Sequence, residues 1–451
     1  MTNTTSSRPA AVPSGEGAQH VQPSRPGRAL LPLRVEGGGN GPDGPRRAPR
    51  PAISMREMGL DGGVAVGPSA GENRLLGIYA KSPSLLGQET YNPGLARLER
   101  FSLQSVVRHV LPGGRTAKCL RVRRRTSEGQ EASISVWRSV EFESAHYKGL
   151  QTCGSVWACP VCSAKISERR RIELAAAIAM HKAAGGDVLL LTLTNRHDRR
   201  DDLGKLIQGQ AEALRRFMRG TKSAKGWFND LGSIGTIRAM EVTHGDANGW
   251  HPHYHLLVFV KSKPDLTYMA RSGAAIWAKC CTLAGLKEPS IERGLTLQGG
   301  DYAARYVGKW GLEQEMTKGH QKKARPGGAT PFDLLRRILA NRHDKRSAAL
   351  FEEFARVFKG RRQLVWSKGL KERFAIEDTT DEQLADGVVE GSELFAQISL
   401  IQWRQVLRAE AQGAHQIRGQ ILDLAGRNDR FGFELLMSAL SVKPARFPLR
   451  R

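Results

Sequence analysis

The pattern of hydrophobic and polar residues divides the middle of the chain into predicted helices and strands. Apolar side chains recur at helical spacing between residues 163 and 184, namely Ile166, Leu174, Ile178 and Met180. Gly185-Gly186 predicts the end of this helix, because glycine accepts the left-handed backbone that follows many helices. The run VLLLTLT at 188–194 has the length and composition of a buried strand.

A second group of elements follows directly. Residues 202–219 have the pattern of a basic amphipathic helix, and Gly235 to Thr243 is typical of a strand. The sequence GDANG at 245–249 is rich in turn-forming residues, and His253 to Val260 predicts another strand. Because a short turn joins the last two strands, we expect them to form an antiparallel hairpin.

The two ends of the chain have a less regular pattern. Residues 265–285 and 300–311 predict helices, Leu364 to Trp366 predicts a short strand, and 380–440 is mainly helical in pattern. The first 70 or so residues are rich in Pro, Gly, Ser and Arg and have no apolar period. Such a composition buries too little surface to offset chain entropy. We therefore predict a disordered basic arm at 1–75, with regular structure beginning near residue 95.

Composition adds a strong positive charge to this picture. The chain of 451 residues has 69 Lys plus Arg against 44 Asp plus Glu, which gives a formal net charge of +25. A field of this sign attracts polyanions such as DNA and RNA. No apolar run approaches the roughly 20 residues that a membrane helix needs, and no signal-peptide pattern opens the chain. We expect a cytoplasmic protein without membrane contacts, whose six cysteines are reduced thiols or metal ligands.

The most informative motif is the pentapeptide His251-Pro252-His253-Tyr254-His255, at the start of the predicted strand. Side chains on a strand alternate between faces, so His253 and His255 point to the same side and Tyr254 to the other. Imidazole is a common metal ligand. Two imidazoles side by side on a rigid strand therefore supply half of a metal site.

A pair of tyrosines lies in the helix predicted at 300–311. Tyr302 and Tyr306 are four residues apart and share one helical face, and Lys309 lies on the same face three residues further on. A tyrosine hydroxyl can act as a covalent nucleophile. A nearby cation lowers its pKa and stabilises negative charge that develops at phosphorus. Core packing of both tyrosines is the alternative when this segment is considered alone.

The cysteines Cys153, Cys159 and Cys162 lie immediately before the first predicted helix. A C-x-x-C pair with a further upstream cysteine is typical of three thiolates of a structural zinc site. Cys119 is favoured as the fourth ligand, with His146 as the alternative. Buried free thiols or a redox pair are the competing interpretations. On the helix that follows, three consecutive residues are candidates to contact DNA phosphates, namely Arg169, Arg170 and Arg171.

Taken together, these motifs resemble the HUH (His-hydrophobic-His) endonucleases, specifically the rolling-circle replication initiator (Rep) proteins of bacterial plasmids. The resemblance covers about residues 100–375. Leu191–Thr194 resembles the first motif of that family, and His253–Leu257 resembles the metal motif. Tyr302–Lys309 resembles the nucleophile motif, and Gly360–Leu370 resembles a stretch that often follows it.

The resemblance implies an α+β fold with a ferredoxin-like core and a central antiparallel sheet. On this basis we expect a Cys-rich zinc module at 95–175 and the endonuclease domain at 180–375. A helical C-terminal region would occupy 380–451.

The implied reaction is a metal-assisted transesterification on single-stranded origin DNA. An Mg²⁺ or Mn²⁺ ion on His253 and His255 would polarise the scissile phosphate. Tyr306 would attack phosphorus and keep a 5′-phosphotyrosine, and the freed 3′-hydroxyl would prime replication. Related initiators carry a tyrosine or a glutamate four residues before the nucleophile, so Tyr302 favours a second transesterification that rejoins the strand. Arg305, between the tyrosines, is a candidate DNA contact.

A hard divalent ion needs more ligands than two imidazoles. Glu241 is the first choice for the third ligand, because it lies on the strand expected to pair with His253 and His255. His251 is the alternative. It shares the face of the other two histidines, but the intervening Pro252 suggests the entry of a strand.

Other classes of function remain open. A single-strand transposase or a conjugative relaxase would share the nicking chemistry, although relaxases usually carry their tyrosine before the histidine motif. A non-enzymatic zinc-containing DNA-binding protein would not need His253, His255 and Tyr306 together. We expect single- and double-stranded origin DNA as partners, with a host helicase as a further candidate.

Overall fold

The computed structural model describes residues 93–300, 303, 328–387 and 391–441. The basic arm predicted at 1–75 lies outside the described residues, as does most of the helix predicted at 300–311. Within the described ranges the protein is of the α+β class, with two antiparallel sheets and several helices. No helix in these ranges is both long and apolar enough to cross a membrane.

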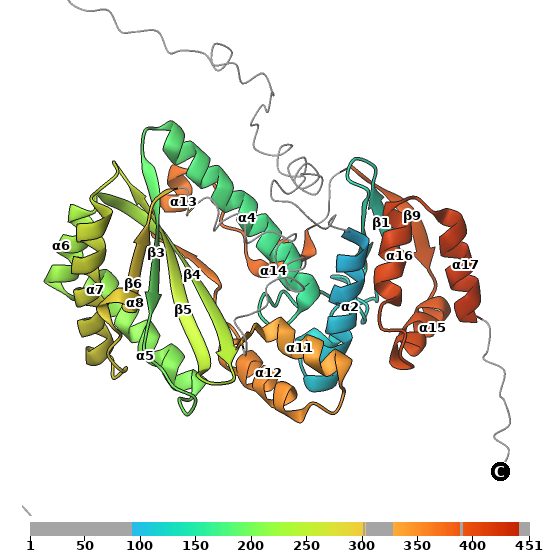
Figure 1. Cartoon of the computed structure of the whole chain (residues 1–451). Helices are drawn as coiled ribbons and strands as arrows, with labels where there is room; N and C mark the ends of the chain where they lie inside the picture. The colour runs from blue at the N-terminus through green and yellow to red at the C-terminus, as the bar shows by residue number, and fades with distance from the viewer. Residues whose placement is uncertain (1–92, 301–302, 304–327, 388–390, 442–451) are drawn as a thin grey trace, which may run out of the picture. The chain divides into compact units, whose positions relative to one another are not determined.

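The larger sheet has six strands, all paired antiparallel. Their order is β6-β3-β5-β4-β7, and β8 also pairs with β4 (Figure 1). The strands are β3 (Asp187–Thr194), β4 (Ser233–Gly245), β5 (Gly249–Val260), β6 (Leu295–Gln298), β7 (Gly328–Ala329) and β8 (Leu364–Trp366). The predicted hairpin is confirmed as β4 and β5, which pair along almost their whole length.

Strand β5 begins at Gly249, so the prediction that Pro252 marks the entry of the strand is wrong. Pro252 lies opposite Val242 within the β4–β5 ladder. Strand β3 ends opposite His253, so at Pro252 the strand β5 has a neighbour on one side only. A proline lacks an N–H and is therefore tolerated where part of a strand has a free edge.

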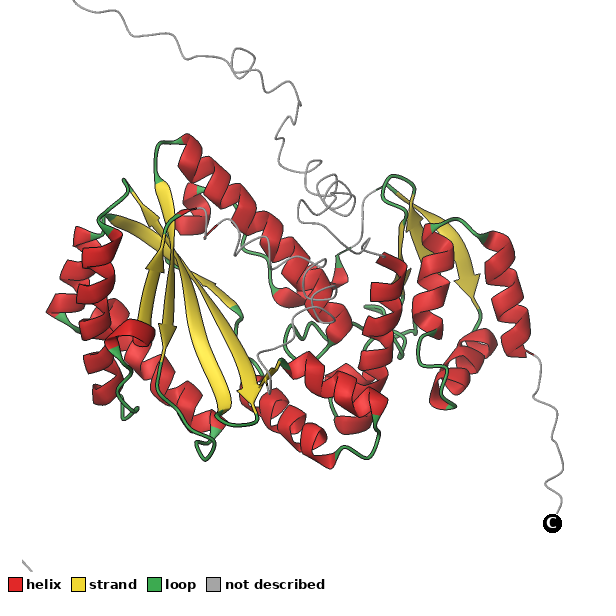
Figure 2. Ribbon diagram, viewed as in Figure 1, coloured by secondary structure: helices red, strands yellow, loops and turns green. Residues whose placement is uncertain are grey.

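Helices cover both faces of this sheet (Figure 2). One face packs against α5 (Leu203–Arg215), α6 (Lys222–Asp230) and α7 (Leu266–Leu283), with Tyr254 and Leu256 in the shared core. The other face packs against α4 (Pro160–Ala183) and α13 (Leu370–Arg373). The alternating side chains of the buried strands thus serve two separate cores.

Local sequence explains where these helices begin and end. Pro160 occupies the first turn of α4, where its missing N–H costs nothing. Asp202 caps α5 by accepting a hydrogen bond from the backbone N–H of Lys205. The helix predicted at 202–219 is split, because its last turn is a π-helical segment at Arg216–Gly220.

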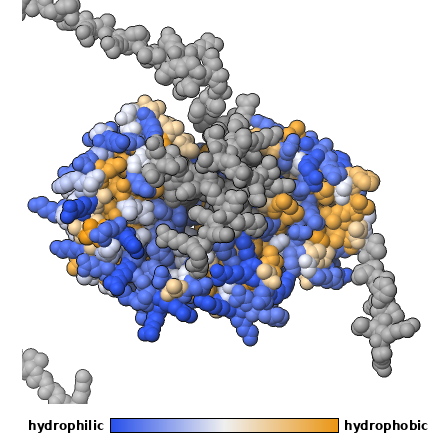
Figure 3. All heavy atoms as spheres, viewed as in Figure 1, coloured by the Kyte–Doolittle hydropathy of each residue, from blue (hydrophilic) through white to orange (hydrophobic). Residues whose placement is uncertain are grey.

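The smaller sheet has the order β2-β1-β9, with β1 (Ile134–Ser139), β2 (Ser144–Lys148) and β9 (Ser392–Ile398). Strand β9 interrupts the region predicted as mainly helical. The helices that follow are α15 (Leu400–Ala411), α16 (Ile417–Gly426) and α17 (Arg430–Ser441). Figure 3 shows hydrophobic residues on the surface of these C-terminal helices, where Ile401, Phe431 and Leu435 are exposed.

The remaining helices connect these parts. They are α2 (Pro93–Val110), α3 (Arg115–Lys118), α8 (Ile291–Gly294), α11 (Pro331–Ala340), α12 (Lys345–Phe358) and α14 (Asp381–Asp386). The C-terminal helices, the smaller sheet and four cysteines share one hydrophobic core. Residues that the sequence analysis assigns to an N-terminal module and to a C-terminal region therefore fold together.

A buried ionic network joins the same parts. Arg418 is fully buried, and its guanidinium donates to both carboxylate oxygens of Glu410, at 2.9 and 2.8 Å. Arg121 donates to the same carboxylate at 2.7 Å. Arg418 also donates to the side chain of Gln104 on α2 and to the carbonyl of Leu120. Buried charges of this kind are tolerated only when they are paired and hydrogen-bonded.

Candidate functional site

The register of the larger sheet brings the predicted metal ligands to one place. Glu241 on β4 lies directly opposite His253 on β5. On the other side of β5, Thr192 of β3 lies opposite His255. Residues that face each other across a ladder point to the same side of the sheet. All four side chains therefore share the face that packs against α4 and α13.

The distances within this group are short. One carboxylate oxygen of Glu241 lies 3.4 Å from Nε2 of His253 and 3.6 Å from Nε2 of His255. One atom from each of the three residues lies within 4.8 Å of the other two. The imidazole side chains are only 13% and 14% exposed, whereas that of Glu241 is 39% exposed. The group is thus anchored in the sheet but open on one side.

The Nε2 atoms of the two imidazoles face Glu241, whereas their Nδ1 atoms lie beside other hydrogen-bonding groups. The Thr192 hydroxyl lies 2.9 Å from Nδ1 of His255. The carbonyl of His251 lies 3.4 Å from Nδ1 of His253. Such outer hydrogen bonds fix the orientation of metal-binding histidines. Sequence reasoning missed the bond from Thr192, although strand alternation in LTLT places this hydroxyl on the histidine face.

Electrostatics favour a negatively charged Glu241. Desolvation raises the pKa of its carboxyl, but hydrogen bonds and positive charge from His253 and His255 outweigh it. The pKa is held well below its usual range. The result is a carboxylate that faces two imidazoles, which is a donor set suited to a divalent ion.

His251, the alternative third ligand, has a different partner. Its Nδ1 lies 2.6 Å from Nε2 of His197, a residue that the sequence analysis did not single out. Burial lowers the pKa of His197, which favours the neutral ring that such a nitrogen–nitrogen bond requires. His251 is not in the group formed by Glu241, His253 and His255. The geometry therefore favours Glu241 over His251 as the third ligand.

The tyrosine motif lies outside the described residues, so Tyr302, Arg305, Tyr306 and Lys309 are not placed. Ala303, within the motif, is described and is fully buried. It belongs to the same core as Leu190, Ala239 and Leu257, which lies on the histidine face of the sheet. Part of the motif thus packs beneath the face that carries Glu241, His253 and His255.

The four cysteines form the second group of ligand-type side chains. Cys119, Cys153, Cys159 and Cys162 are all buried, and their sulfur atoms lie within 4.8 Å of one another. The Cys119–Cys162, Cys153–Cys162 and Cys119–Cys159 sulfur separations are 3.5, 3.6 and 3.8 Å. A disulfide would require about 2.05 Å. A tetrahedral Zn²⁺ with bonds of about 2.3 Å requires ligand separations of about 3.8 Å. The spacing fits a closed zinc site.

His146, the alternative fourth zinc ligand, is not in this group. It lies on β2 and is 8% exposed, and its Nε2 has no hydrogen-bond partner among the described residues. Burial and the charges of Lys165 and Lys148 lower its pKa to about 4. The structure thus brings Cys119, and not His146, to Cys153, Cys159 and Cys162.

The arginines proposed to contact DNA are held within the protein. Arg170 donates to Glu173 and to Asp381, and its side chain is 11% exposed. Arg171 pairs with Glu168 and is 12% exposed. Arg169 packs against the backbone of Gly387. The intramolecular carboxylates leave little of Arg170 or Arg171 to contact a phosphate.

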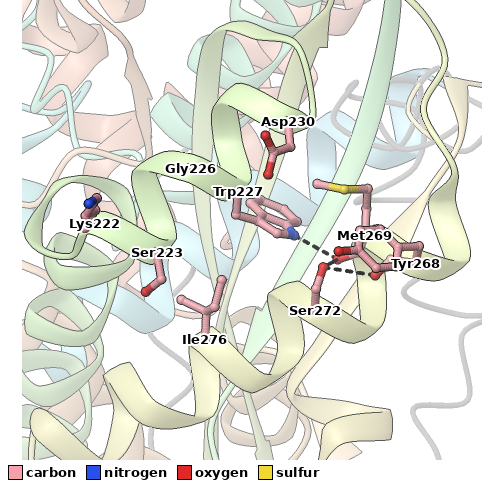
Figure 4. Close-up of a pocket in the computed structure, with 9 residues that line it drawn as sticks. All are labelled: Lys222, Ser223, Gly226, Trp227, Asp230, Tyr268, Met269, Ser272 and Ile276. Atoms are coloured by element: carbon pink, nitrogen blue, oxygen red, sulfur yellow. Dashed lines mark hydrogen bonds between the residues drawn. The ribbon is translucent and has the colours of Figure 1, made fainter.

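One hollow lies away from this chemistry. A cavity of about 700 Å³ lies between α6 and α7, with Trp227, Met269 and Tyr268 among its lining residues (Figure 4). The indole N–H of Trp227 donates to the carbonyl of Met269 at 2.9 Å. Both helices cover the face of the sheet opposite Glu241. This hollow therefore does not belong to the histidine site.

Comparison with known proteins supports a role in replication. Residues 146–282, which include His253, His255 and three of the four clustered cysteines, match the family described as "Replication protein". A protein from Streptomyces lividans with the name "Protein rep" is 29% identical, over 58% of this chain and 73% of its own length. A "Neomycin resistance protein" from Streptomyces cyanogenus is 36% identical, over 26% of this chain and 32% of its own length. No solved structure matches the chain significantly.

The fold and the site define an α+β protein with a His-x-His strand beside a carboxylate. Over residues 146–282 the chain matches the family of replication proteins, and it is similar to a Rep protein along most of that relative's length.

Proposed function

We propose that this protein initiates rolling-circle replication of a plasmid by nicking one strand of origin DNA and later rejoining it. The observation that carries the proposal is the convergence of Glu241, His253 and His255 on one face of the larger sheet. The segment with Tyr302 and Tyr306 begins directly after β6 of the same sheet. A metal-binding group and a nucleophile segment in one domain suit strand transfer at phosphorus.

Glu241, His253 and His255 would hold the ion, and their mixed oxygen and nitrogen donors fit Mg²⁺ or Mn²⁺. When bound, the ion would polarise a non-bridging oxygen of the scissile phosphate. Thr192 would keep the His255 ring in place through the bond at Nδ1. The exposed side of Glu241 leaves room for a phosphate and water.

Tyr306 would be the nucleophile. Its phenolic oxygen would form a bond to phosphorus, and the bond from phosphorus to the 3′-oxygen of the preceding nucleotide would break. The products are a 5′-phosphotyrosine and a free 3′-hydroxyl, because the phenolic proton would pass to water and the leaving 3′-oxygen would take a proton from water. Lys309 would stabilise the negative charge in the transition state. Tyr302 would serve a second transfer of the same kind, and Arg305 would contact the DNA backbone.

For the cysteines, we propose a structural zinc ion held by Cys119, Cys153, Cys159 and Cys162. The burial of all four cysteines and their short sulfur separations support a closed site with no position for substrate. A host helicase as partner and a cytoplasmic location stay predictions.

The covalent adduct tests the chemistry. The protein would be incubated with Mn²⁺ and labelled single-stranded oligonucleotides that tile the DNA flanking its own gene. We expect a site-specific 5′-phosphotyrosyl adduct that is lost or redirected in Tyr306→Phe. Tyr268→Phe is the matched control, because Tyr268 is 68% exposed on α7 and should keep the wild-type adduct. An unchanged adduct in Tyr306→Phe would contradict the assignment. An adduct only with unrelated DNA ends would favour a transposase.

The two histidines are tested by separating cleavage from binding. In His253→Ala/His255→Ala, nicking should stop while DNA binding persists. His343→Ala is the control, since His343 is exposed in the turn between α11 and α12. Metal-dependent nicking by the double variant would refute the role of these histidines.

A further inference from the structure

A second, basic hollow lies beside the cysteine cluster. It has a volume of about 380 Å³ and is lined by Arg115, Lys118, Arg124, Arg125, Gln151 and Thr152. Four of the six lining residues are cations, and all four are exposed. The lining contains no carboxylate and no aromatic side chain.

The backbone holds the walls of this hollow in register. The N–H of Leu120 donates to the carbonyl of Gln151 at 2.7 Å, and the N–H of Gln151 donates to the carbonyl of Val122 at 2.8 Å. The N–H of Arg124 donates to Gly149 at 2.8 Å. Gly149 has a φ of +83°, and a Cβ there would lie 1.9 Å from the carbonyl oxygen of Ser133. Backbone hydrogen bonds thus join the two segments that carry the lining residues, and Gly149 lies where only glycine fits against Ser133.

The cysteine cluster also holds together the two segments that carry the lining residues. Lys118 immediately precedes Cys119, and Thr152 immediately precedes Cys153. The two sulfur atoms belong to one buried group. The cations of the hollow therefore project from a rigid base, which lowers the entropy cost of binding an anion.

The charges in this hollow are largely available. Arg124 pairs with Asp386, and this ion pair reduces its contribution. Arg115, Lys118 and Arg125 have no ion pair with a described residue, in contrast to Arg170 and Arg171 on α4. A concentration of unpaired cations costs free energy unless an anion binds there.

We propose that this hollow binds backbone phosphates of double-stranded DNA, at a site separate from the nicking site. Single-strand binding relies on aromatic side chains that stack on bases, and the lining has none. Arg, Lys, Gln and Thr are residues that contact phosphate and sugar and fix the register of a protein on a duplex. This proposal rests on the proposed function in one respect only. The duplex that binds here would be the origin DNA on which the initiator acts.

The test is the salt dependence of duplex binding. The full-length protein would be titrated into a labelled 20-base-pair duplex of arbitrary sequence, without divalent ions, across a series of salt concentrations. Each phosphate contact contributes about 0.9 to the slope of log K against log salt. In Arg115→Gln/Lys118→Gln/Arg125→Gln we expect a slope smaller by about 2 to 3 and affinity at least about tenfold weaker.

A matched variant separates local contact from total charge. Lys263→Gln/Arg271→Gln/Lys279→Gln removes three exposed cations before and within α7, which likewise have no ion pair with a described residue. It should change the slope by less than about 1. Equal losses in the two triple variants would overturn the proposal, because overall charge would then account for the effect.

Two further measurements keep the result interpretable. Arg115→Lys/Arg125→Lys keeps the charge and should keep most of the slope. If the neutralised triple variant unfolds early, Arg115→Gln and Arg125→Gln alone should each lower the slope by about 1. Equal weakening of oligo-dT and duplex binding would overturn the assignment to double-stranded DNA. All of these measurements report DNA binding and none requires cleavage. Their outcome is therefore independent of whether Tyr306 is the nucleophile.

Discussion

The two clusters of ligand-type side chains differ most in their access to solvent. All four cysteines are buried, and their sulfur atoms lie within 4.8 Å of one another. In the other cluster the histidines are nearly buried, but Glu241 is 39% exposed. Structural metal sites are closed, whereas catalytic sites keep open positions for substrate and water. The contrast is the basis for the two different roles proposed above, a structural zinc site and a catalytic metal site.

The clusters also differ in how the fold builds them. Glu241, His253 and His255 lie on two strands of a hairpin, so their placement follows from local register. The cysteines come from segments separated by up to 43 residues, and the C-terminal helices complete the core around them. Loss of a cysteine should therefore disturb folding, whereas loss of a histidine-site residue should disturb chemistry.

The largest expected effect is the removal of one cysteine. Cys159→Ala should release the zinc and unfold the surrounding core, because structural zinc contributes on the order of 10 kcal/mol in small zinc modules. Cys281→Ala is the control. Cys281 is fully buried on α7, and burial raises its pKa to about 12, so it stays a neutral thiol. Metal analysis and thermal unfolding would check the prediction. A zinc-free wild-type protein with a normal melting curve would contradict it.

The next largest effect is the loss of nicking activity on substitution of Glu241, with the fold retained. Glu241→Ala should lower nicking and the affinity for Mn²⁺ by at least about a hundredfold. The melting temperature should hardly change, because Glu241 is partly exposed and belongs to no hydrophobic core cluster. Glu434→Ala, at an exposed position on α17, is the matched control. A large drop in stability in Glu241→Ala would break the distinction between the two clusters.

Acid should affect the region around the cysteines through His146. Its pKa is about 4 in the folded protein, against about 6.5 in an unfolded chain. The unfolded state then binds more protons between these values, so stability is lost as pH falls from about 6.5 to 4. The loss at pH 4.5 should be roughly 2 to 3 kcal/mol.

His146→Gln isolates this contribution. The variant should lose less stability than the wild type between pH 7 and pH 4.5, as measured by denaturant unfolding at each pH. The comparison is between two proteins with the same cysteines, so protonation of the thiols affects both alike. Identical acid sensitivity would show that His146 is not the group responsible.

Sequence reasoning succeeded where the determining contacts are local. The GDANG turn predicted the β4–β5 hairpin, and strand alternation placed His253 and His255 on one face. Their pairing with Glu241 followed from the same register. The C-x-x-C spacing likewise drew attention to the cysteines, which the structure brings together with Cys119.

Long-range contacts were beyond that reasoning. Strand β9 pairs with β1, about 250 residues earlier, inside a region with mainly helical pattern. Arg418 is fully buried, which no rule about charged residues anticipates. The sequence alone predicts that Arg170 and Arg171 contact DNA, but carboxylates on α4 and α14 bind them. Burial and ion pairing depend on segments that come together only in the folded protein.

The smallest predicted effect concerns Thr192, whose hydroxyl orients the His255 ring in the open site. Thr192→Val would remove the hydroxyl that lies 2.9 Å from Nδ1 of His255, without changing the shape of the side chain much. Loss of a hydrogen bond to a metal ligand typically lowers metal affinity or activity by about 10- to 100-fold. We expect a loss of about tenfold here. Thr236→Val, on the opposite face of the same sheet, is the control. Mn²⁺ titration of nicking would measure the shift, which higher metal concentration should overcome. If Thr192→Val instead lowered nicking equally at all Mn²⁺ concentrations, the hydroxyl would act on the reaction itself and not on the metal ligand.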